Sequence, residues 1–513
     1  MKLRKAKPRP FPKPANEVAD AAELRRRLYV AELTIYKLEE RLRMDRIRRF
    51  GPASEQLSSL QLELLELEPG VSQEEVAAEA AREPIETLPA PPAVRPRTGR
   101  QTLPDNLPRV EQVIACSETE CRCEACGGEK AVIGYDESEM LDVKPAEFYV
   151  VVTKREKRAC RNCQDAGVTA AALPARIIEK SLVSDRIILD ALIDKYLNHL
   201  PLYRQSLILS REAGVDISRA TMDGWVIRVG ELLLPVREAM KAELLAGRYI
   251  QADETTVPVQ LHDGGGSNHQ AYLWQYGTPG GEVVFDFRMG RNRDGPRAFL
   301  GSYEGILQTD GYAVYEKIGG PKLSHIGCWA HARRPFAEAL KDNPGDRLAG
   351  ELLILINELF AIDAVARERN LSLPDRHELR RESAPAVLER LRQARDRGIG
   401  QALHRSTVGK GLQYLVGQWS KLTRVFDHAE AELSNNLAEN SMRPVAVGRK
   451  NWIHVGSEGA GPKVAAILSV IESCRRLRVP VREYLASVLP GLGDVPLSRV
   501  PSLTPSAWAA RRA

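Results

Sequence analysis

The chain has 513 residues, of which 43% are hydrophobic and 27% are charged, and its formal net charge is +5. This ordinary globular composition leaves room for several domains, and the mild charge means that any affinity for nucleic acid has to come from local basic clusters. No stretch approaches the roughly 18 apolar residues of a membrane span, and no apolar run follows the basic N-terminus as in a signal peptide, so we expect a cytoplasmic protein without a membrane partner.

The N-terminal part of the chain predicts a tail, a helix and a linker. Residues 1–18 are basic and rich in proline, which is typical of a disordered tail. Residues 19–68 carry a short apolar repeat that indicates either a self-associating coiled coil or an amphipathic helix packed on its own domain. The repeat comprises Leu24, Leu28, Ala31, Ile35, Leu38 and Leu42. Residues 69–112 are rich in proline and predict an extended linker.

Residues 113–168 contain two CxxC pairs in a segment that alternates apolar and polar residues. The pairs are Cys123 with Cys126 and Cys160 with Cys163, and the alternation between them predicts β-strands. Two thiolate pairs that a hairpin brings together form a closed tetrahedral zinc site. We therefore expect a zinc-ribbon-like domain in which Zn²⁺ supports the fold.

Residues 180–240 predict a helical subdomain. The segment LPLYRQSLILSREAG ends at Gly214, and Ser218 is placed to cap a second helix. A helix, a short turn and a helix are the parts of a DNA-binding helix-turn-helix, and they are equally the parts of a plain helical subdomain.

Two predicted strands carry an acid at or near their C-terminal ends. The apolar run 249–252 leads to Asp253, and the run 306–307 leads to Asp310. Further strands are predicted between Gln270 and Gly290, where QAYLWQYG and EVVFDFRMG follow one another.

A third acid, Glu439, lies on a predicted helix that ends at Pro444. This order of elements is that of an RNase H-like core: a strand with an acid, hairpin strands, a second strand with an acid, and a distant helix with a third acid. In-line attack on a phosphodiester uses two divalent ions about 4 Å apart, and oxygen ligands select Mg²⁺ or Mn²⁺. Asp253, Asp310 and Glu439 are therefore the candidate catalytic metal ligands. The chain has 68 Asp and Glu residues, so each acid alone is equally explained as a surface carboxylate, and the stretches that flank the acids carry the assignment.

Basic and amide side chains lie close to the predicted acids in the sequence. Such groups bind DNA phosphates, and the candidates are Arg333, Arg334, Asn436, Asn440, Arg443, Arg449 and Lys450. Cys328 and His331 form a further motif with two interpretations. They are either metal ligands or residues that position the helix carrying the two arginines beside Asp310.

Four longer stretches connect these acids to a known family: ADETTVPV around Asp253, QTDGYAVYEKI around Asp310, HIGCWAHARRPFAEAL after it, and SNNLAENSMRPVAVGRKNWIHVGSEGAG around Glu439. The apolar repeat followed by FGPASEQL, the linker GRQTLPDNLPRVE, the CxxC pairs and the tail VREYLASVLPGL occur in the same order as in that family. Together they resemble the DDE transposases of the bacterial insertion sequence 66 family, over nearly the whole chain from about Leu24.

The resemblance implies a multi-domain α/β protein with an RNase H-like catalytic core. The catalytic domain would span residues 245–465, with a helical insertion at about 345–430, and a C-terminal tail domain would span residues 466–513. The coiled-coil helix, the zinc-ribbon-like domain and the helical subdomain would precede it.

The implied activity is metal-dependent cleavage of DNA at the ends of an insertion sequence, followed by strand transfer into target DNA. Implied partners are DNA with terminal inverted repeats, target DNA, a second copy of the chain in a homodimer or larger assembly, and accessory proteins of the same element. The rival interpretation is a non-catalytic, zinc-containing DNA-binding protein or an inactive transposase copy.

Overall fold

The computed structural model describes residues 148–159, 168–261, 268–452 and 454–512. The chain divides into two compact units, of which the smaller spans Ile85–Ala171. The expected tail, coiled coil and linker over residues 1–112 lie outside the described residues, and so do the four predicted zinc ligands, Cys123, Cys126, Cys160 and Cys163. No described helix combines the length and the apolar character needed to cross a membrane.

The described part of the smaller unit is a short antiparallel hairpin. Strand β1 (Lys157–Ala159) pairs with β2 (Val168–Ala170), and the Arg155 Nε donates to the Ala171 carbonyl at 2.9 Å. The strands are shorter than the sequence predicted, because residues 148–156 lie outside any strand.

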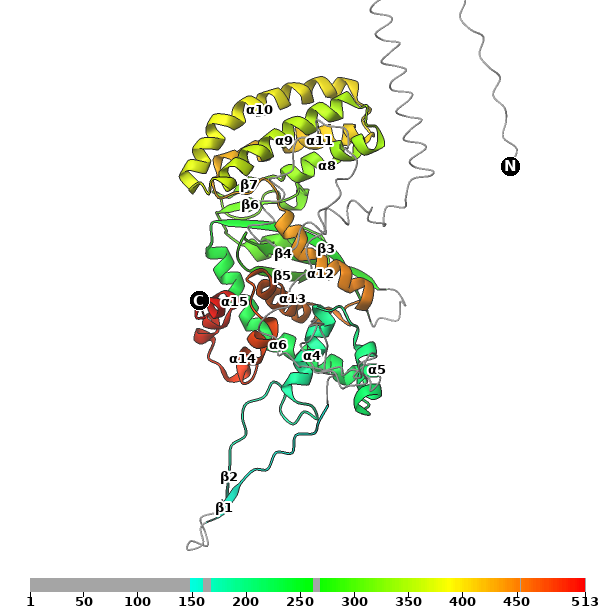
Figure 1. The fold of residues 1–513 in the computed structure, drawn as a ribbon, viewed down its shortest axis with the longest axis vertical. Helices are drawn as coiled ribbons and strands as arrows, with labels where there is room; N and C mark the ends of the chain where they lie inside the picture. Colours follow the sequence, from blue (N-terminus) through cyan, green and yellow to red (C-terminus); the bar gives the residue numbers. More distant parts are fainter. Residues whose placement is uncertain (1–147, 160–167, 262–267, 453, 513) are drawn as a thin grey trace, which may run out of the picture. The chain divides into compact units, whose positions relative to one another are not determined.

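A five-stranded sheet forms the centre of the larger unit (Figure 1). Its strands are β3 (Tyr249–Val259), β4 (His269–Gly277), β5 (Val283–Arg288), β6 (Ile306–Gln308) and β7 (Ser324–Ile326), in the order β5-β4-β3-β6-β7. β3, β4 and β5 pair antiparallel, whereas β6 pairs parallel with β3 and β7 pairs parallel with β6. The predicted strands at 249–252, 306–307 and 270–290 are thereby confirmed.

Strand β3 is longer than predicted. It does not end near Asp253 but continues to Val259, because Val257 and Val259 are buried and β4 pairs along its length. Asp253 therefore lies inside a strand, at the point where the parallel partner β6 has already ended.

Three helices precede the sheet: α4 (Asp185–Tyr196), α5 (Leu202–Ala213) and α6 (Arg219–Ala246). Gly214 ends α5 with φ +65°, a backbone conformation that favours glycine. The Ser218 side chain accepts a hydrogen bond from Thr221 N and caps α6. The predicted helix, turn and helix are confirmed, although α6 runs on to Ala246 and packs against α13.

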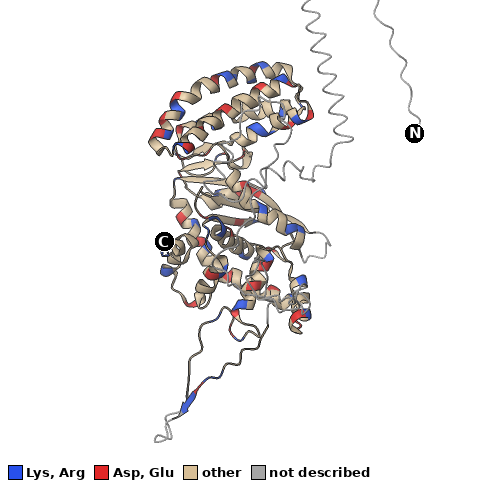
Figure 2. Ribbon diagram, in the orientation of Figure 1, with Lys and Arg blue, Asp and Glu red and all other residues tan. Residues whose placement is uncertain are grey.

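Between β5 and β6 lies α7 (Asp294–Leu300), and after β7 the chain forms four helices before it returns to the sheet. These are α8 (Trp329–Asp342), α9 (Arg347–Glu368), α10 (Leu373–Gln401) and α11 (Thr407–Arg424). Helix α8 carries Arg333 and Arg334, and α9 begins at Arg347, close to the start at about residue 345 that is expected for the helical insertion. Figure 2 shows basic and acidic residues interspersed along α10, a pattern typical of a solvated face.

Helix α12 (Asn436–Trp452) then packs on β3 and β4. The prediction that Pro444 ends this helix is wrong. Proline removes one backbone donor, but Met442, Val445 and Gly448 are buried on either side of it, and their packing carries the helix through.

The chain ends with α13 (Gly461–Arg476), α14 (Val481–Val488) and α15 (Pro505–Ala510). α13 crosses the expected domain boundary at residue 465 and covers the edge strand β5. The Ser469 and Ser473 hydroxyls accept hydrogen bonds of 2.8 Å from Phe285 N and Val283 N, so the exposed ladder of the edge strand is satisfied. The short 3-10 turns are Ala313–Tyr315, Val425–Asp427, Glu458–Ala460, Leu492–Asp494 and Leu497–Leu503.

Two hydrophobic cores flank the sheet. The sheet core joins α4, α6, α13 and α14 to β3, β4 and β5. The insertion core joins α8, α9, α10 and α11 to Tyr249, Ile306, Ile326 and the segment 425–433. Figure 1 shows α8–α11 grouped beside β6 and β7, away from α6, α13 and α14.

Candidate active site

The parallel pairing of β3 with β6 sets the positions of the first two acids. Gln251 faces Gln308 in the last pair of this ladder. Asp253 and Asp310 each follow that pair by two residues, so the two acids leave the ladder at the same level. Both side chains are partly buried, and the charge of Asp310 contributes to raising the pKa of Asp253.

Helix α12 brings the third acid to the same place. Glu439 lies in its first turn, and the helix packs on β3. Burial raises the pKa of Asp253 well above its usual range, and the charges of Glu439, Glu254 and Asp310 raise it further. The charges of Glu439 and Asp310 therefore act on Asp253, and the three predicted acids come from β3, from the turn after β6 and from α12.

Each of these carboxylates has a partner within the protein. Asp253 accepts from Glu254 N at 2.9 Å, and Asp310 accepts from Tyr312 N at 2.9 Å. Glu439 lies 3.1 Å from Arg334 Nη2 and 3.4 Å from His331 Nε2. With these rotamers, no three His, Cys, Asp or Glu side chains of the described residues form a group that could hold a metal ion.

The chemistry of the cluster nevertheless fits a divalent cation. Three partly buried carboxylates repel one another, and a hard cation relieves that repulsion better than any neutral ligand. Glu439 Oε1 and both side-chain amide atoms of Asn435 are buried without a hydrogen-bond partner among the described residues. A cation bound by the acids would compete with Arg334 for Glu439.

The predicted phosphate-binding residues on α8 have different surroundings. Arg334 pairs with Glu439 and keeps about half of its side chain exposed. The Arg333 Nε donates to Asn357 Oδ1 on α9 at 2.7 Å, so this side chain contributes to the packing of α8 on α9.

The predicted residues on α12 differ in the same way. The Arg449 Nη1 donates to Thr256 O at 2.7 Å and to the hydroxyls of Thr255 and Thr256, which ties α12 to β3. Lys450 is exposed. Asn436 begins the helix, whereas Asn440 and Arg443 line a cavity of about 320 Å³ between α4, α12 and α13.

Cys328 and His331 lie next to Glu439. The Cys328 thiol is free, fully buried and accepts a hydrogen bond from Asn435 N at 3.4 Å. Burial lowers the pKa of His331, but contact with Cys328 and the charge of Glu439 outweigh it and raise that pKa to about 9. Both interpretations of Cys328 and His331, as metal ligands or as residues that position the helix carrying Arg333 and Arg334, stay predictions.

Sequence reasoning missed two sets of residues at the site. Glu254 lies beside Asp253 in the sequence and is held by Arg291 Nη2 at 2.6 Å and Tyr315 OH at 3.1 Å. Gln251 and Gln308 lie two residues before the strand acids. The repeat of Gln-x-Asp at 251–253 and 308–310 was the signal that could have found them.

Residues 180–463, more than half of the chain, match the family model described as Transposase IS66 family. Residues 120–164 match the zinc-finger binding domain of transposase IS66, and residues 37–111 match the model described as Transposase C of IS166 homeodomain. The chain belongs to the IS66 transposase family. The zinc-finger match includes all four predicted cysteine ligands, which supports a structural Zn²⁺ in that segment.

Two relatives come from Sinorhizobium fredii, and both are described as uncharacterized proteins. The protein y4qI is 32% identical over 430 residues, which cover 80% of this chain and 77% of the relative. The protein y4hP is 30% identical over 503 residues, which cover 93% of this chain and 88% of the relative.

Proposed function

We propose that this protein is a DDE transposase that cleaves DNA at the ends of an insertion sequence and transfers the strands into target DNA. The observation that carries the proposal is the shared level of Asp253 and Asp310 beyond the Gln251–Gln308 pair, with Glu439 brought to them by α12. The sheet order supports an RNase H-like core, because the two acid-bearing strands are adjacent and parallel and the hairpin strands lie to one side.

In this proposal Asp253, Asp310 and Glu439 bind two Mg²⁺ or Mn²⁺ ions. When bound, such ions activate the attacking oxygen and stabilise the leaving oxygen of the phosphodiester. Arg334 and Lys450 are the candidates that keep exposed cationic groups for DNA phosphates. Arg333 and Arg449 position α8 and α12 through the contacts described above, and Asn436, Asn440 and Arg443 remain candidates for DNA contact.

The other segments are proposed to bring the DNA ends together. Cys123, Cys126, Cys160 and Cys163 would hold the structural zinc, and the α5–α6 region would help to recognise the terminal repeats. The N-terminal helix would pair two copies of the chain, because two ends must be cut together. Accessory proteins of the same element are further proposed partners.

The decisive experiment is cleavage of a labelled duplex that carries the element's end, with Mg²⁺ or Mn²⁺, by the native protein and by Glu439→Gln. The substitution keeps the size of the side chain but removes the charge that binds a cation. We expect the native protein to nick the duplex and the variant to bind DNA without nicking it. The exposed Glu458→Gln is the matched control and should nick normally.

Equal nicking by the native protein and Glu439→Gln would remove Glu439 from the site. Tight DNA binding without nicking by the native protein, even with the element's other proteins added, would favour the rival, a non-catalytic DNA-binding protein.

A further inference from the structure

A pair of buried glutamines lies at the end of the parallel ladder, two residues before Asp253 and Asp310. Gln251 on β3 and Gln308 on β6 face each other in the parallel ladder, and their exposed fractions are 1% and 0%. The Gln251 Nε2 donates to Gln308 Oε1 at 2.9 Å. Burying two primary amides is costly unless their hydrogen-bonding capacity is used, so their partners indicate what the pair does.

Every hydrogen-bonding position of the Gln308 amide is occupied. Its Nε2 donates to the carbonyls of Gly327 at 3.0 Å and Glu432 at 2.8 Å. Its Oε1 accepts from Gln251 and from the Tyr249 hydroxyl. An amide has two donor hydrogens and two acceptor lone pairs, so no other side chain of similar shape can replace it.

The partners lie in the segment that leads into α12. The Gln251 Nε2 also donates to Ser434 O at 3.0 Å, and the Tyr249 hydroxyl accepts from Glu432 N at 3.1 Å. The helix starts immediately afterwards, where Glu439 N donates to Asn435 O at 3.2 Å. The two glutamines therefore connect the strands that carry two acids to the backbone that carries the third.

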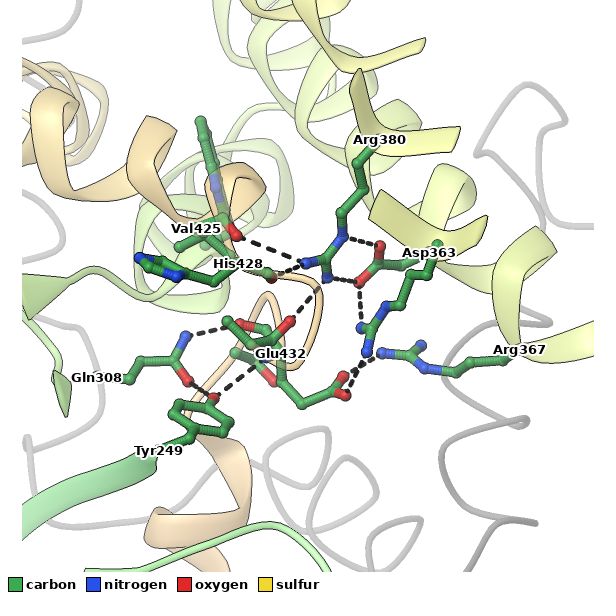
Figure 3. A network of polar contacts seen from close by, with 12 residues as sticks. Tyr249, Gln308, Asp363, Arg367, Arg380, Val425, His428 and Glu432 are labelled. Atoms are coloured by element: carbon green, nitrogen blue, oxygen red, sulfur yellow. Dashed lines mark hydrogen bonds and ion pairs between the residues drawn. The ribbon is translucent and has the colours of Figure 1, made fainter. Parts of the chain in front are cut away.

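The same segment is held from the other side by a charge cluster of the insertion core (Figure 3). The Glu432 carboxylate pairs with Arg367 at 2.7 Å and with Arg376 at 3.1 Å. Arg376 and Arg380 both pair with Asp363, and the Arg380 guanidinium donates to the His428 and Ala431 carbonyls. Residues 428–434 are thus clamped between the insertion helices and the glutamine pair.

We propose that Gln251 and Gln308 form a positioning hub that fixes the spacing of Asp253, Asp310 and Glu439 for metal binding. The inference rests on the proposed function of the acids as metal ligands, and it assigns to the two glutamines a role that is separate from ligation. Neither glutamine touches the metal; each acts through the backbone that carries an acid.

The test is direct Mn²⁺ binding to the full chain, followed by electron paramagnetic resonance, with thermal unfolding measured on the same samples. Gln308→Met keeps a linear side chain but loses all four hydrogen bonds. We expect its Mn²⁺ affinity to fall by about 10-fold or more, as for residues that orient metal ligands without binding the metal. The Mn²⁺ concentration for half-maximal nicking should rise by the same factor, whereas DNA binding stays unchanged.

The chain offers a matched control on the same sheet. Gln275 on β4 faces Asp253, is fully buried, and has no hydrogen-bond partner for either amide atom among the described residues. Gln275→Met removes a buried amide next to the same acid without touching the segment 432–434. Its Mn²⁺ affinity should stay within about twofold of the native value, since only residues that orient ligands carry the larger cost.

The milder variant Tyr249→Phe removes the hydroxyl that bonds both glutamines and Glu432 N, and its ring still fills the insertion core. If Gln308→Met fails to fold, Tyr249→Phe tests the hub in its place. We expect Tyr249→Phe to bind Mn²⁺ more weakly than the native chain. A folded Gln308→Met or Tyr249→Phe with native affinity overturns the hub, as does an equal loss in Gln275→Met. If the native chain neither binds Mn²⁺ nor nicks DNA, the proposed function itself fails.

Discussion

The sheet core and the insertion core contribute to the candidate site in different ways. The sheet core covers β5 with serine hydroxyls and apolar side chains, and it packs against β3, α12 and Tyr312, whose backbone N–H donates to Asp310. Helices α9 and α10 of the insertion core also carry a cluster of buried and partly buried charges, and its members contact the segment just before Glu439. Helices α9 and α10 therefore contribute directly to the architecture of the candidate site, whereas the sheet core mainly supports the fold.

The difference separates two ways of placing an acid. Asp253 lies within β3, which pairs with β4, and Asp310 follows β6 directly after the parallel ladder ends, so backbone pairing of the sheet contributes to placing both acids. Glu439 is placed by side chains from distant parts of the sequence, which a single substitution can release. Changes in the insertion core should therefore disturb stability and metal binding together, and changes in the sheet core should disturb stability alone.

The largest effect is expected from Arg380→Met. The Arg380 side chain is fully buried and donates hydrogen bonds to Asp363, His428 O and Ala431 O. Without it, the buried Asp363 carboxylate loses a positively charged partner and the two carbonyls lose a hydrogen-bond donor. Breaking a buried pair from one side lowers the free energy of unfolding by about 3–5 kcal/mol. Urea denaturation measures the loss, and Mn²⁺ binding should weaken in the same variant.

Arg381→Met is the control for this prediction. Arg381 is the next residue of α10, is largely exposed, and pairs only with the exposed Glu378 in the described structure. The free energy of unfolding should stay close to the native value, because solvent screens an exposed ion pair. A similar loss of unfolding free energy in Arg380→Met and Arg381→Met would show that the charge cluster does not stabilise the fold more than an exposed ion pair does.

In the sheet core, Glu282 should give a pH-dependent stability. Burial raises the pKa of Glu282 to about 7, although a hydrogen bond from the Ser506 backbone N–H acts in the opposite direction and lowers it. Between pH 4.5 and 7 the folded chain keeps a proton that the unfolded chain has released, so the free energy of unfolding falls as pH rises through this window, by up to about 3 kcal/mol.

The side chain of Glu282→Gln is neutral at every pH, so the free energy of unfolding of this variant should not fall between pH 4.5 and 7. Thermal unfolding at a series of pH values measures the difference. Because Glu282 belongs to the sheet side, Mn²⁺ affinity at constant pH should be the same in the variant and the native protein. If Glu282→Gln also changed the Mn²⁺ affinity, the prediction that changes in the sheet core affect stability alone would be contradicted.

The same contrast explains which features the sequence could predict. The strands and the helical pair around Ser218 follow local rules of periodicity and capping, and the structure agrees with them. Local rules failed at Asp253, where the strand continues, and at Pro444, where core packing outweighs a helix breaker.

Contacts between distant residues could not be predicted from one sequence. Gln251 bonds a carbonyl 183 positions away and Gln308 one 124 positions away, and neither partner carries a side-chain signal because both acceptors are backbone atoms. Arg449 looked like a phosphate-binding group in the sequence, and only the fold shows that Thr255 and Thr256 bind it.

The smallest effect on stability, but a specific effect on the site, is expected from Tyr414→Phe. The Tyr414 hydroxyl on α11 donates to the Asp310 carbonyl at 2.7 Å, and Gln418 on the same helix donates to the Gly311 carbonyl at 3.3 Å. Losing one such hydrogen bond costs about 0.5–1.5 kcal/mol of unfolding free energy. Since α11 belongs to the insertion core, the loop after β6 should loosen and the Mn²⁺ requirement of nicking should rise.

Tyr203→Phe on α5 provides the comparison, because Tyr203 is half-exposed and its hydroxyl accepts only from the neighbouring Arg204 in the described structure. It should change neither stability nor the Mn²⁺ requirement. If Tyr414→Phe shifts the Mn²⁺ requirement without a matching loss of stability, the insertion core acts on Asp310 as well as on Glu439. If only stability changes, the influence of the insertion stops at the segment before α12, and backbone pairing alone places both strand acids.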